Sequence, residues 1–321
     1  MVFIAGVGRS GSTLLERVLG ELPGVCSVGE VVHLWERGVR NNERCGCGAA
    51  FHDCPFWRRV GEVAFGGWAN ADPDRVHELQ RTVDDVRYVP RLVVSRVGGE
   101  FRRALEEYNA YYERLYAAVR QVSGCHVVID SSKRTSLAYC LRRSPRLRLR
   151  VLHVVRDSRA VAYAWTKTVR RPEVVDADSY MPRFSPAYLA LLWNGHNALL
   201  QALRWLGTPR RLVRYERFMA APEAVLADVA HFAELSIDET ALSFLDDGHV
   251  RLSATHTVAG NPMRFTTGRV ELRRDDEWRR SFPEGQRRVV SALTFPVGAC
   301  YGYGVPRPRP AAERMSRASA E

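Results

Sequence analysis

Lysine is almost absent from this sequence. Of the 47 basic residues only two are lysines, Lys133 and Lys167, so arginine supplies nearly all of the positive charge. Lysine carries a compact ammonium group and arginine a planar fork of donors, so the two are not interchangeable where geometry matters. A lysine that persists against such a bias indicates a position that needs the ammonium group, and we expect this above all of Lys133.

Long apolar runs are also absent. The first apolar stretch begins at Val2 and is far too short for a secretory signal or a membrane span. We therefore expect an intracellular, cytoplasmic protein without a membrane span. Its seven cysteines are an odd number, which in an intracellular chain does not favour a disulfide framework. The sequence leaves the oligomeric state open.

The positive charge is not accompanied by a nucleic-acid signature. The formal net charge is +11, yet the chain contains no tail-like basic block, zinc-finger motif or RNA-binding motif. The basic residues are spread along the chain, as on a solvated surface, so we predict no nucleic-acid partner. A concave part of such a surface also suits a doubly phosphorylated nucleotide.

Residues 3–15, FIAGVGRSGSTLL, form the most informative stretch. Their pattern predicts a short apolar strand, a glycine-rich turn and a helix that starts near Gly11. Glycines let the backbone turn sharply and approach a ligand, and the free N–H groups of a helix's first turn favour an anion. We predict a phosphate-binding loop at the end of the first strand. Its binding residues are Arg9, Ser10, Gly11, Ser12 and Thr13.

Three classes of ligand fit this loop. The loop that binds ATP or GTP needs a lysine where this chain has Ser12. GVGRSG also satisfies the dinucleotide spacing G-x-G-x-x-G, with Glu30 about where a ribose-binding acid lies. The third class is a phosphosulfate nucleotide. The loop resembles the 5′-phosphosulfate loop of sulfotransferases that use 3′-phosphoadenosine 5′-phosphosulfate (PAPS), in the version with arginine before Ser-Gly that tyrosylprotein and carbohydrate sulfotransferases and many bacterial relatives have.

A second segment resembles the same family. VVRDSRAVAYAW, residues 154–165, is similar to the segment that binds the 3′-phosphate of the nucleotide. The resemblance implies that Arg156 clamps this phosphate with its bidentate fork. The family has a serine eight residues further on, whereas this chain has Ala164. Thr166 or Lys167 would then supply the missing hydrogen bond.

Two later segments also resemble the family. VRYERF, residues 213–218, is similar to a strand end whose tyrosine lies near the nucleotide, which implies that role for Tyr215. Residues 256–303 resemble a late loop that closes over the 3′-phosphate and the adenine. Among the arginines of this loop we select Arg264 as a nucleotide-binding residue.

The resemblance implies sulfuryl transfer from PAPS to a hydroxyl group of a small-molecule acceptor, aromatic, lipid-like or a sugar, with 3′,5′-ADP as product and no required metal. Lys133 would face the sulfuryl group, and Arg9 would stabilise the leaving phosphate. Glu30 would be the general base, as a glutamate of this region is in the resembling enzymes, with His33 as the second choice. The alternatives are a P-loop nucleotide kinase-like phosphotransferase with Asp130 as its metal-holding acid, a NAD-binding oxidoreductase, and a binding module without activity.

Strand and helix patterns alternate along the chain. Helices separate or follow the predicted buried strands, which lie at 2–5, 25–30, 125–130, 148–155 and 211–216. This alternation is typical of a three-layer α/β/α fold with a central parallel sheet, which binds ligands at the carboxyl ends of its strands. We expect one domain over 1–304, a helical insertion over about 60–124 and a disordered tail over 305–321.

Tyrosines recur at helical spacing within the predicted insertion, at Tyr108, Tyr112 and Tyr116. Such a stripe is typical of a helix face that packs into a core. It would also suit one wall of a pocket for the acceptor.

The polar loop 41–57 contains four possible metal ligands, Cys45, Cys47, His52 and Cys54. Their spacing, Cys-x-Cys followed by His-x-Cys, lacks the usual Cys-x₂₋₄-Cys of structural zinc. We therefore favour a loop without metal. Its packing would come from the aromatic side chains of Phe51, Phe56 and Trp57.

Overall fold

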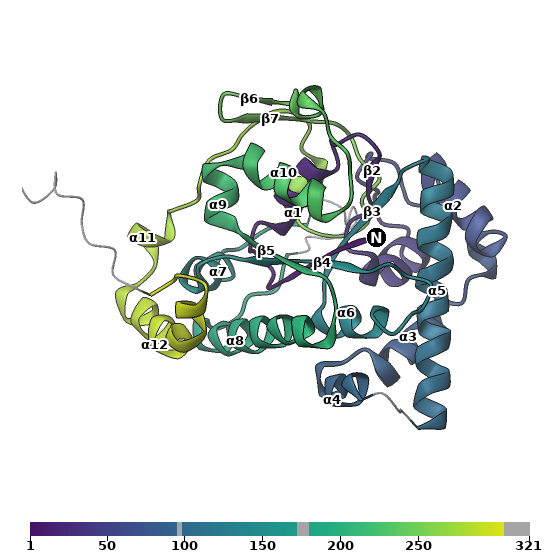
Figure 1. Ribbon diagram of the computed structural model, residues 1–321, viewed down its shortest axis with the longest axis horizontal. Coiled ribbons are helices and arrows are strands. Elements are labelled where there is room, and N and C mark those ends of the chain that lie inside the picture. The colour runs from purple at the N-terminus through teal and green to yellow at the C-terminus, as the bar shows by residue number, and fades with distance from the viewer. Residues whose placement is uncertain (95–97, 172–179, 305–321) are drawn as a thin grey trace, which may run out of the picture.

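Five parallel strands form the centre of the fold (Figure 1). The computed structural model describes residues 1–94, 98–171 and 180–304, and the strand order is β2-β3-β1-β4-β5, with every neighbouring pair parallel. The fold class is therefore the predicted one, whereas the tail over 305–321 lies outside the described residues. The strands are β1 (Val2–Gly6), β2 (Val25–Ser27), β3 (Val127–Lys133), β4 (Arg150–Val155) and β5 (Arg210–Arg214).

Helices cover both faces of this sheet. In β1, Phe3 and Ala5 pack into one hydrophobic cluster and Val2 and Ile4 into another, because successive side chains of a strand point to opposite faces. Burial on both faces explains why the strands read as continuous apolar runs. The first cluster includes residues of α5 (Gly99–Ser123) and α6 (Thr135–Leu141), and the second includes residues of α1 (Ser12–Leu19) and α10 (Pro222–Phe232).

A third hydrophobic cluster extends the core beyond β4. Val7, just after β1, and Val155, at the end of β4, contribute to it together with residues from several helices. This cluster holds the ends of β1 and β4 against the last part of the chain. Its helices are α7 (Ser158–Ala164), α8 (Pro186–Ala202), α11 (Trp278–Ser281) and α12 (Glu284–Cys300).

The stretch between β2 and β3 is helical. Figure 1 shows α5 as the long helix at one end of the molecule, and α2 and α3 both contact it. Among the described residues, no helix combines the length and the apolar character that a membrane crossing requires. Besides α5, the elements of this stretch are three 3₁₀ turns (Val31–His33, Trp68–Asn70 and Val86–Tyr88), a π-helix (Leu34–Arg40), α2 (Pro55–Phe65), α3 (Pro73–Val83) and α4 (Val89–Val93).

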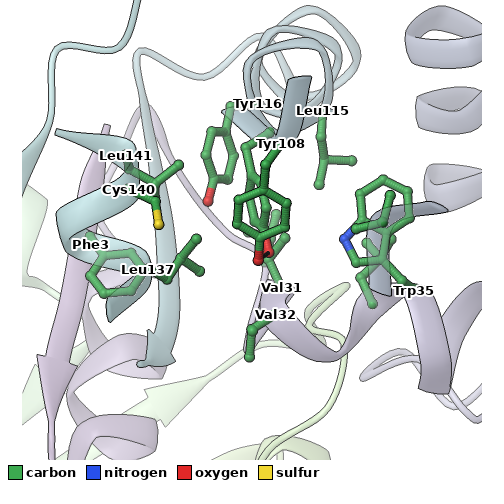
Figure 2. Packing of buried hydrophobic residues seen from close by; sticks show 14 of the residues in the cluster. Phe3, Val31, Val32, Trp35, Tyr108, Leu115, Tyr116, Leu137, Cys140 and Leu141 are labelled. Atoms are coloured by element: carbon green, nitrogen blue, oxygen red, sulfur yellow. Dashed lines mark hydrogen bonds between the residues drawn. The ribbon is translucent and has the colours of Figure 1, made fainter. Parts of the chain in front are cut away.

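The tyrosine stripe of α5 belongs to the core. Figure 2 shows Tyr108 and Tyr116 among apolar side chains such as Leu137. Tyr108, Tyr112 and Tyr116 are almost completely buried, and the hydroxyl groups of Tyr108 and Tyr116 donate to the carboxylates of Asp84 (2.9 Å) and Asp130 (2.5 Å). These three tyrosines therefore pack into the core, as the helical spacing predicts.

Strand β3 runs on to Lys133, beyond the predicted end at Asp130. The polar residues at its end find partners inside the protein. The Ser131 hydroxyl donates to the Glu16 carboxylate, and the Ser132 N–H donates to the Asp130 carboxylate at 2.7 Å. The strand therefore continues through side chains that sequence polarity assigns to a loop.

The segment predicted as a late loop over 256–303 contains regular structure, namely the strand β8 (Gly268–Glu271) and the helices α11 and α12. A three-stranded antiparallel sheet precedes α11 and α12. Strands this short carry too few alternating residues for a periodic signal. They are β6 (Leu245–Asp246), β7 (His249–Leu252) and β8 (Gly268–Glu271).

Candidate active site

A cavity of about 450 Å³ lies at the carboxyl ends of β1, β3 and β4. Parallel strands end at the same edge of a sheet, so motifs that are far apart in the sequence meet there. Most of the predicted site residues line this cavity. They are Arg9, Gly11, Ser12, Thr13, Glu30, Lys133, Arg156 and Tyr215.

The glycine-rich loop forms one side of the cavity. Gly11 precedes α1 with φ of 83°, in the left-handed region that favours glycine, and as a glycine it has no side chain with which to cap the helix. A Cβ atom on Gly11 would come within 2.5 Å of the Tyr215 ring, so the position also needs glycine for space. The N–H groups of the first turn of α1 are therefore available to a ligand in the cavity.

Arg9 lies between the loop and a tryptophan that the sequence did not single out. Its guanidinium is 5.3 Å from the centre of the Trp165 ring and donates to the Met181 sulfur at 2.9 Å. The Trp165 indole donates to the Gly8 carbonyl at 3.0 Å, which fixes the ring against the loop. Burial lowers the pKa of Arg9, although the charge of Glu30 opposes this shift. An anion in the cavity would restore a favourable partner for this cation.

Glu30 and Lys133 form an ion pair in the cavity. Lys133 ends β3 with φ of 61°, and its ammonium group donates to Glu30 Oε1. Burial acts to raise the pKa of Glu30, but the charges of Lys133 and His33 outweigh it, so this pKa lies below its ordinary value. Glu30 is therefore ionised at neutral pH and able to accept a proton.

His33, the second candidate base, lies at 3.7 Å from Glu30 Oε2 through its Nε2 atom. Its side chain is 48% exposed, and it does not line the cavity. Ser10 is buried and also lies outside the cavity lining. Glu30 and Arg9 therefore line the cavity, whereas His33 and Ser10 do not.

A buried carboxylate stabilises the backbone next to Glu30. Glu16 of α1 accepts hydrogen bonds from the hydroxyls of Ser27 and Ser131 and from the Gly29 N–H at 2.7 Å. Burial raises the pKa of Glu16 despite these donors. Since Gly29 precedes Glu30, the carboxylate holds the backbone that carries the candidate base. No sequence spacing indicates this role, because the partners of Glu16 lie 11, 13 and 115 residues away along the chain.

Arg156 also lines the cavity. Its guanidinium lies 4.4 Å from the centre of the Tyr215 ring and donates to the Arg9 carbonyl at 3.2 Å. It also donates at 3.0 Å to the carbonyl and to the carboxylate of Asp275, whose N–H donates to the Tyr215 hydroxyl at 3.2 Å. A ligand phosphate at Arg156 would compete with this carboxylate.

Arg264 is not brought to the cavity. It is buried, and its guanidinium donates at 2.7 Å to the carbonyl groups of Thr257 and Arg44. These bonds tie two backbone segments together, a long-range role that sequence cannot distinguish from ligand binding. Asn261 and Met263 of the same segment line the cavity instead.

The two proposed substitutes for the missing serine differ in position. Ala164 itself lines the cavity, and so does Lys167, whose ammonium group donates to Glu277 at 2.5 Å. The Thr166 hydroxyl instead donates to the Tyr163 carbonyl at 2.7 Å within its own turn. Lys167 is therefore the one of the two that a ligand can reach.

Comparison with solved structures places this fold among sulfotransferase domains. The sulfotransferase domain of the Synechococcus PCC 7002 olefin synthase is similar over 95% of this chain and 95% of its own, with a TM-score of 0.52 and 21% sequence identity. A sulfotransferase domain from the curacin biosynthetic pathway matches 91% of this chain and 96% of its own, with a TM-score of 0.46 and 14% identity. No protein-family model and no curated protein sequence matches the chain.

The chain therefore has the fold of a sulfotransferase domain, with a five-stranded parallel sheet flanked by helices. This likeness confirms, at the level of the fold, the resemblance seen in the loop of residues 3–15 and in the Arg156 segment.

Proposed function

We propose that this protein is a PAPS-dependent sulfotransferase that acts on a hydroxyl group of a small-molecule acceptor. One observation carries the proposal. The anion-binding loop, the Arg156 guanidinium and the Lys133–Glu30 pair all line one cavity, at the sheet edge where this fold class binds ligands. Its volume of about 450 Å³ lies within the usual range of small-molecule sites.

One group of cavity residues would bind the sulfuryl donor. Arg9 and the first turn of α1 would hold the 5′-phosphosulfate, and Arg156 the 3′-phosphate, with Tyr215 beside it. The bound donor supplies the sulfuryl group. Its sulfur bonds to the acceptor oxygen as the bond to the 5′-phosphate oxygen breaks, which leaves 3′,5′-ADP.

Glu30 would take the proton of the acceptor hydroxyl as that oxygen attacks. Lys133 would place its ammonium beside the departing phosphate oxygen, where negative charge grows, and Arg9 would add to this stabilisation. If Lys133 turns from Glu30 toward the donor, Glu30 loses a charge that lowers its pKa and becomes a stronger base. Positioning and fixed positive charge would supply most of the rate, and the reaction needs no metal to bridge outer phosphates.

The alternatives find less support in the cavity. A kinase would need Asp130 to hold a metal ion, but Asp130 is buried, accepts hydrogen bonds from Tyr116 and Ser132, and does not line the cavity. An oxidoreductase would need Glu30 to bind a ribose, and Glu30 pairs with Lys133 instead.

Arg156→Ala tests the nucleotide part of the proposal. We expect the variant to lose about 1.5–3 kcal/mol of binding free energy for 3′,5′-ADP, as for a lost charge-assisted hydrogen bond, and much less for 5′-AMP, which lacks the 3′-phosphate. Calorimetric titration of both nucleotides measures the difference. Arg159→Ala is the control, since Arg159 pairs with Asp157 and does not line the cavity. Equal losses for the two nucleotides would show that Arg156 is not the 3′-phosphate clamp.

A further inference from the structure

Three cysteines and one histidine converge at a distance from the cavity described above. Cys45, Cys47 and Cys54 lie in the loop between the π-helix and α2, and His256 lies in the segment after β7. Each offers one ligand atom, and the four atoms all lie within 4.8 Å of one another. His52, the fourth ligand that the sequence suggests, is not among them. Its Nε2 atom lies 2.9 Å from the Val39 carbonyl oxygen.

Three of the six separations between these atoms are close to those of a tetrahedral metal site. The Sγ atoms of Cys47 and Cys54 are 3.8 Å apart, and His256 Nδ1 lies 3.8 Å from Cys45 Sγ and 3.3 Å from Cys54 Sγ. A tetrahedral Zn²⁺ with bonds of about 2.3 Å to sulfur and about 2.0 Å to nitrogen places sulfur atoms about 3.8 Å apart and sulfur and nitrogen about 3.5 Å apart. The other ligand atoms lie up to 4.8 Å apart, and rotation of the cysteine side chains about their Cα–Cβ bonds can bring them to the separations of a tetrahedral site.

The surroundings hold the four groups in place. Cys45 and Cys54 are buried, and the Phe56 ring stacks on the His256 imidazole at 4.7 Å with an angle of 11° between the rings. The Trp57 indole donates to the His256 carbonyl at 2.8 Å, which fixes the backbone of this ligand. Outer contacts that orient the ligands are typical of metal sites. The aromatic packing predicted for this loop is therefore compatible with a metal site.

We propose that Cys45, Cys47, Cys54 and His256 bind one Zn²⁺ ion in a closed, structural site. Three thiolates and one imidazole are an established ligand set of structural zinc, and a tetrahedral arrangement of sulfur and nitrogen ligands favours zinc over the harder divalent cations. All four positions are protein ligands, so no coordination site is left for a substrate. The zinc ion would therefore have a structural role and not a catalytic one.

The site joins two segments of the chain, one of which continues to the candidate active site. The Gly46 N–H donates to the Thr257 carbonyl at 2.9 Å, and Arg264 donates to carbonyl groups on both segments. From this joint the chain continues to Gly260, where an added Cβ atom would lie 3.0 Å from Glu30 Oε1, and then to Asn261 in the cavity wall. Zinc would hold that wall in position against the candidate base.

Metal analysis of the purified protein tests the site without reference to activity. Protein produced in zinc-supplemented medium is expected to contain one zinc ion per chain by mass spectrometry. After exchange with Co²⁺, it is expected to show the thiolate-to-cobalt charge-transfer band and the intense visible bands of a tetrahedral sulfur site. His256→Ala and Cys54→Ser are expected to lose the bound metal and these bands. His52→Ala and Cys300→Ser, in a neighbouring histidine and an exposed cysteine, are expected to keep both.

Wild-type protein that contains no zinc and gives no tetrahedral cobalt spectrum would overturn the proposal, and this result does not depend on whether any variant folds. Equal metal loss in His52→Ala and His256→Ala would also overturn it, because the two histidines would then be equivalent. Neither measurement requires a nucleotide, so the zinc site and the proposed sulfuryl transfer can fail separately.

Discussion

Glu30→Gln is expected to lower the rate of sulfuryl transfer by about 10²–10⁴ while leaving donor binding nearly unchanged, because a lost general base costs this much. Glutamine keeps the size of the side chain, and its carbonyl oxygen can still accept a hydrogen bond from Lys133. It cannot accept the proton of the acceptor. The loss should be smaller for an acidic phenol than for an alkyl alcohol, since the phenol ionises with less help.

The measurement is single-turnover transfer of labelled sulfate at saturating donor, together with a titration of 3′,5′-ADP. Glu36→Gln is the matched control, because Glu36 is a partly exposed carboxylate that pairs with Arg40. Full activity in Glu30→Gln would move the base to His33. Full activity in Glu30→Gln, in His33→Ala and in the double variant of Glu30 and His33 would remove this region from the chemistry.

Lys133→Arg is expected to be as damaging as removing a transition-state donor, on the order of 10²–10³ in rate, although the positive charge is retained. The side chain of Lys133 lines the cavity, is only 14% exposed and reaches Glu30 from a left-handed backbone position. A planar guanidinium is larger than an ammonium group and cannot take its place beside the departing oxygen.

Lys167→Arg is the matched control for this substitution. Lys167 also lines the cavity, but its ammonium pairs with Glu277 and its side chain is 35% exposed. A guanidinium at this position can still donate to a phosphate oxygen, so the substitution keeps the role that the site allows for Lys167. Single-turnover rates of both variants, measured beside the wild type, separate the two lysines. A wild-type rate in Lys133→Arg would mean that the scarcity of lysine carries no functional information.

The phosphate-binding loop and the strands of the sheet are predictable because their signals are local. A short apolar run, three glycines and a cluster of hydroxyl groups lie within thirteen residues, and the buried strands carry β-branched runs of their own. Since parallel strands end at one edge of the sheet, the sequence also predicts that Glu30, Lys133 and Arg156 approach one another. All three line the same cavity.

Contacts between distant segments are not predictable in this way. Asp275 reaches Arg156 across 119 residues, and His256 reaches Cys54 across 202 residues, with no spacing rule to indicate either contact. Arg264, which the sequence suggests as a nucleotide-binding residue, does not line the cavity, and its contacts with distant carbonyl groups could not be predicted for the same reason. An arginine that binds backbone carbonyl groups and an arginine that binds phosphate look alike in a sequence.

Nucleotide binding in buffer without added magnesium separates the three classes of ligand that fit the loop. Thermal unfolding should show that 3′,5′-ADP stabilises the protein by about 2.7 kcal/mol at a hundredfold excess over its dissociation constant, and that NAD does not. ATP with magnesium, added separately, should have a much smaller effect. The assignment of this cavity to a 3′-phosphorylated sulfuryl donor would be contradicted if saturating 3′,5′-ADP left the melting temperature unchanged while NAD, or ATP with magnesium, raised it.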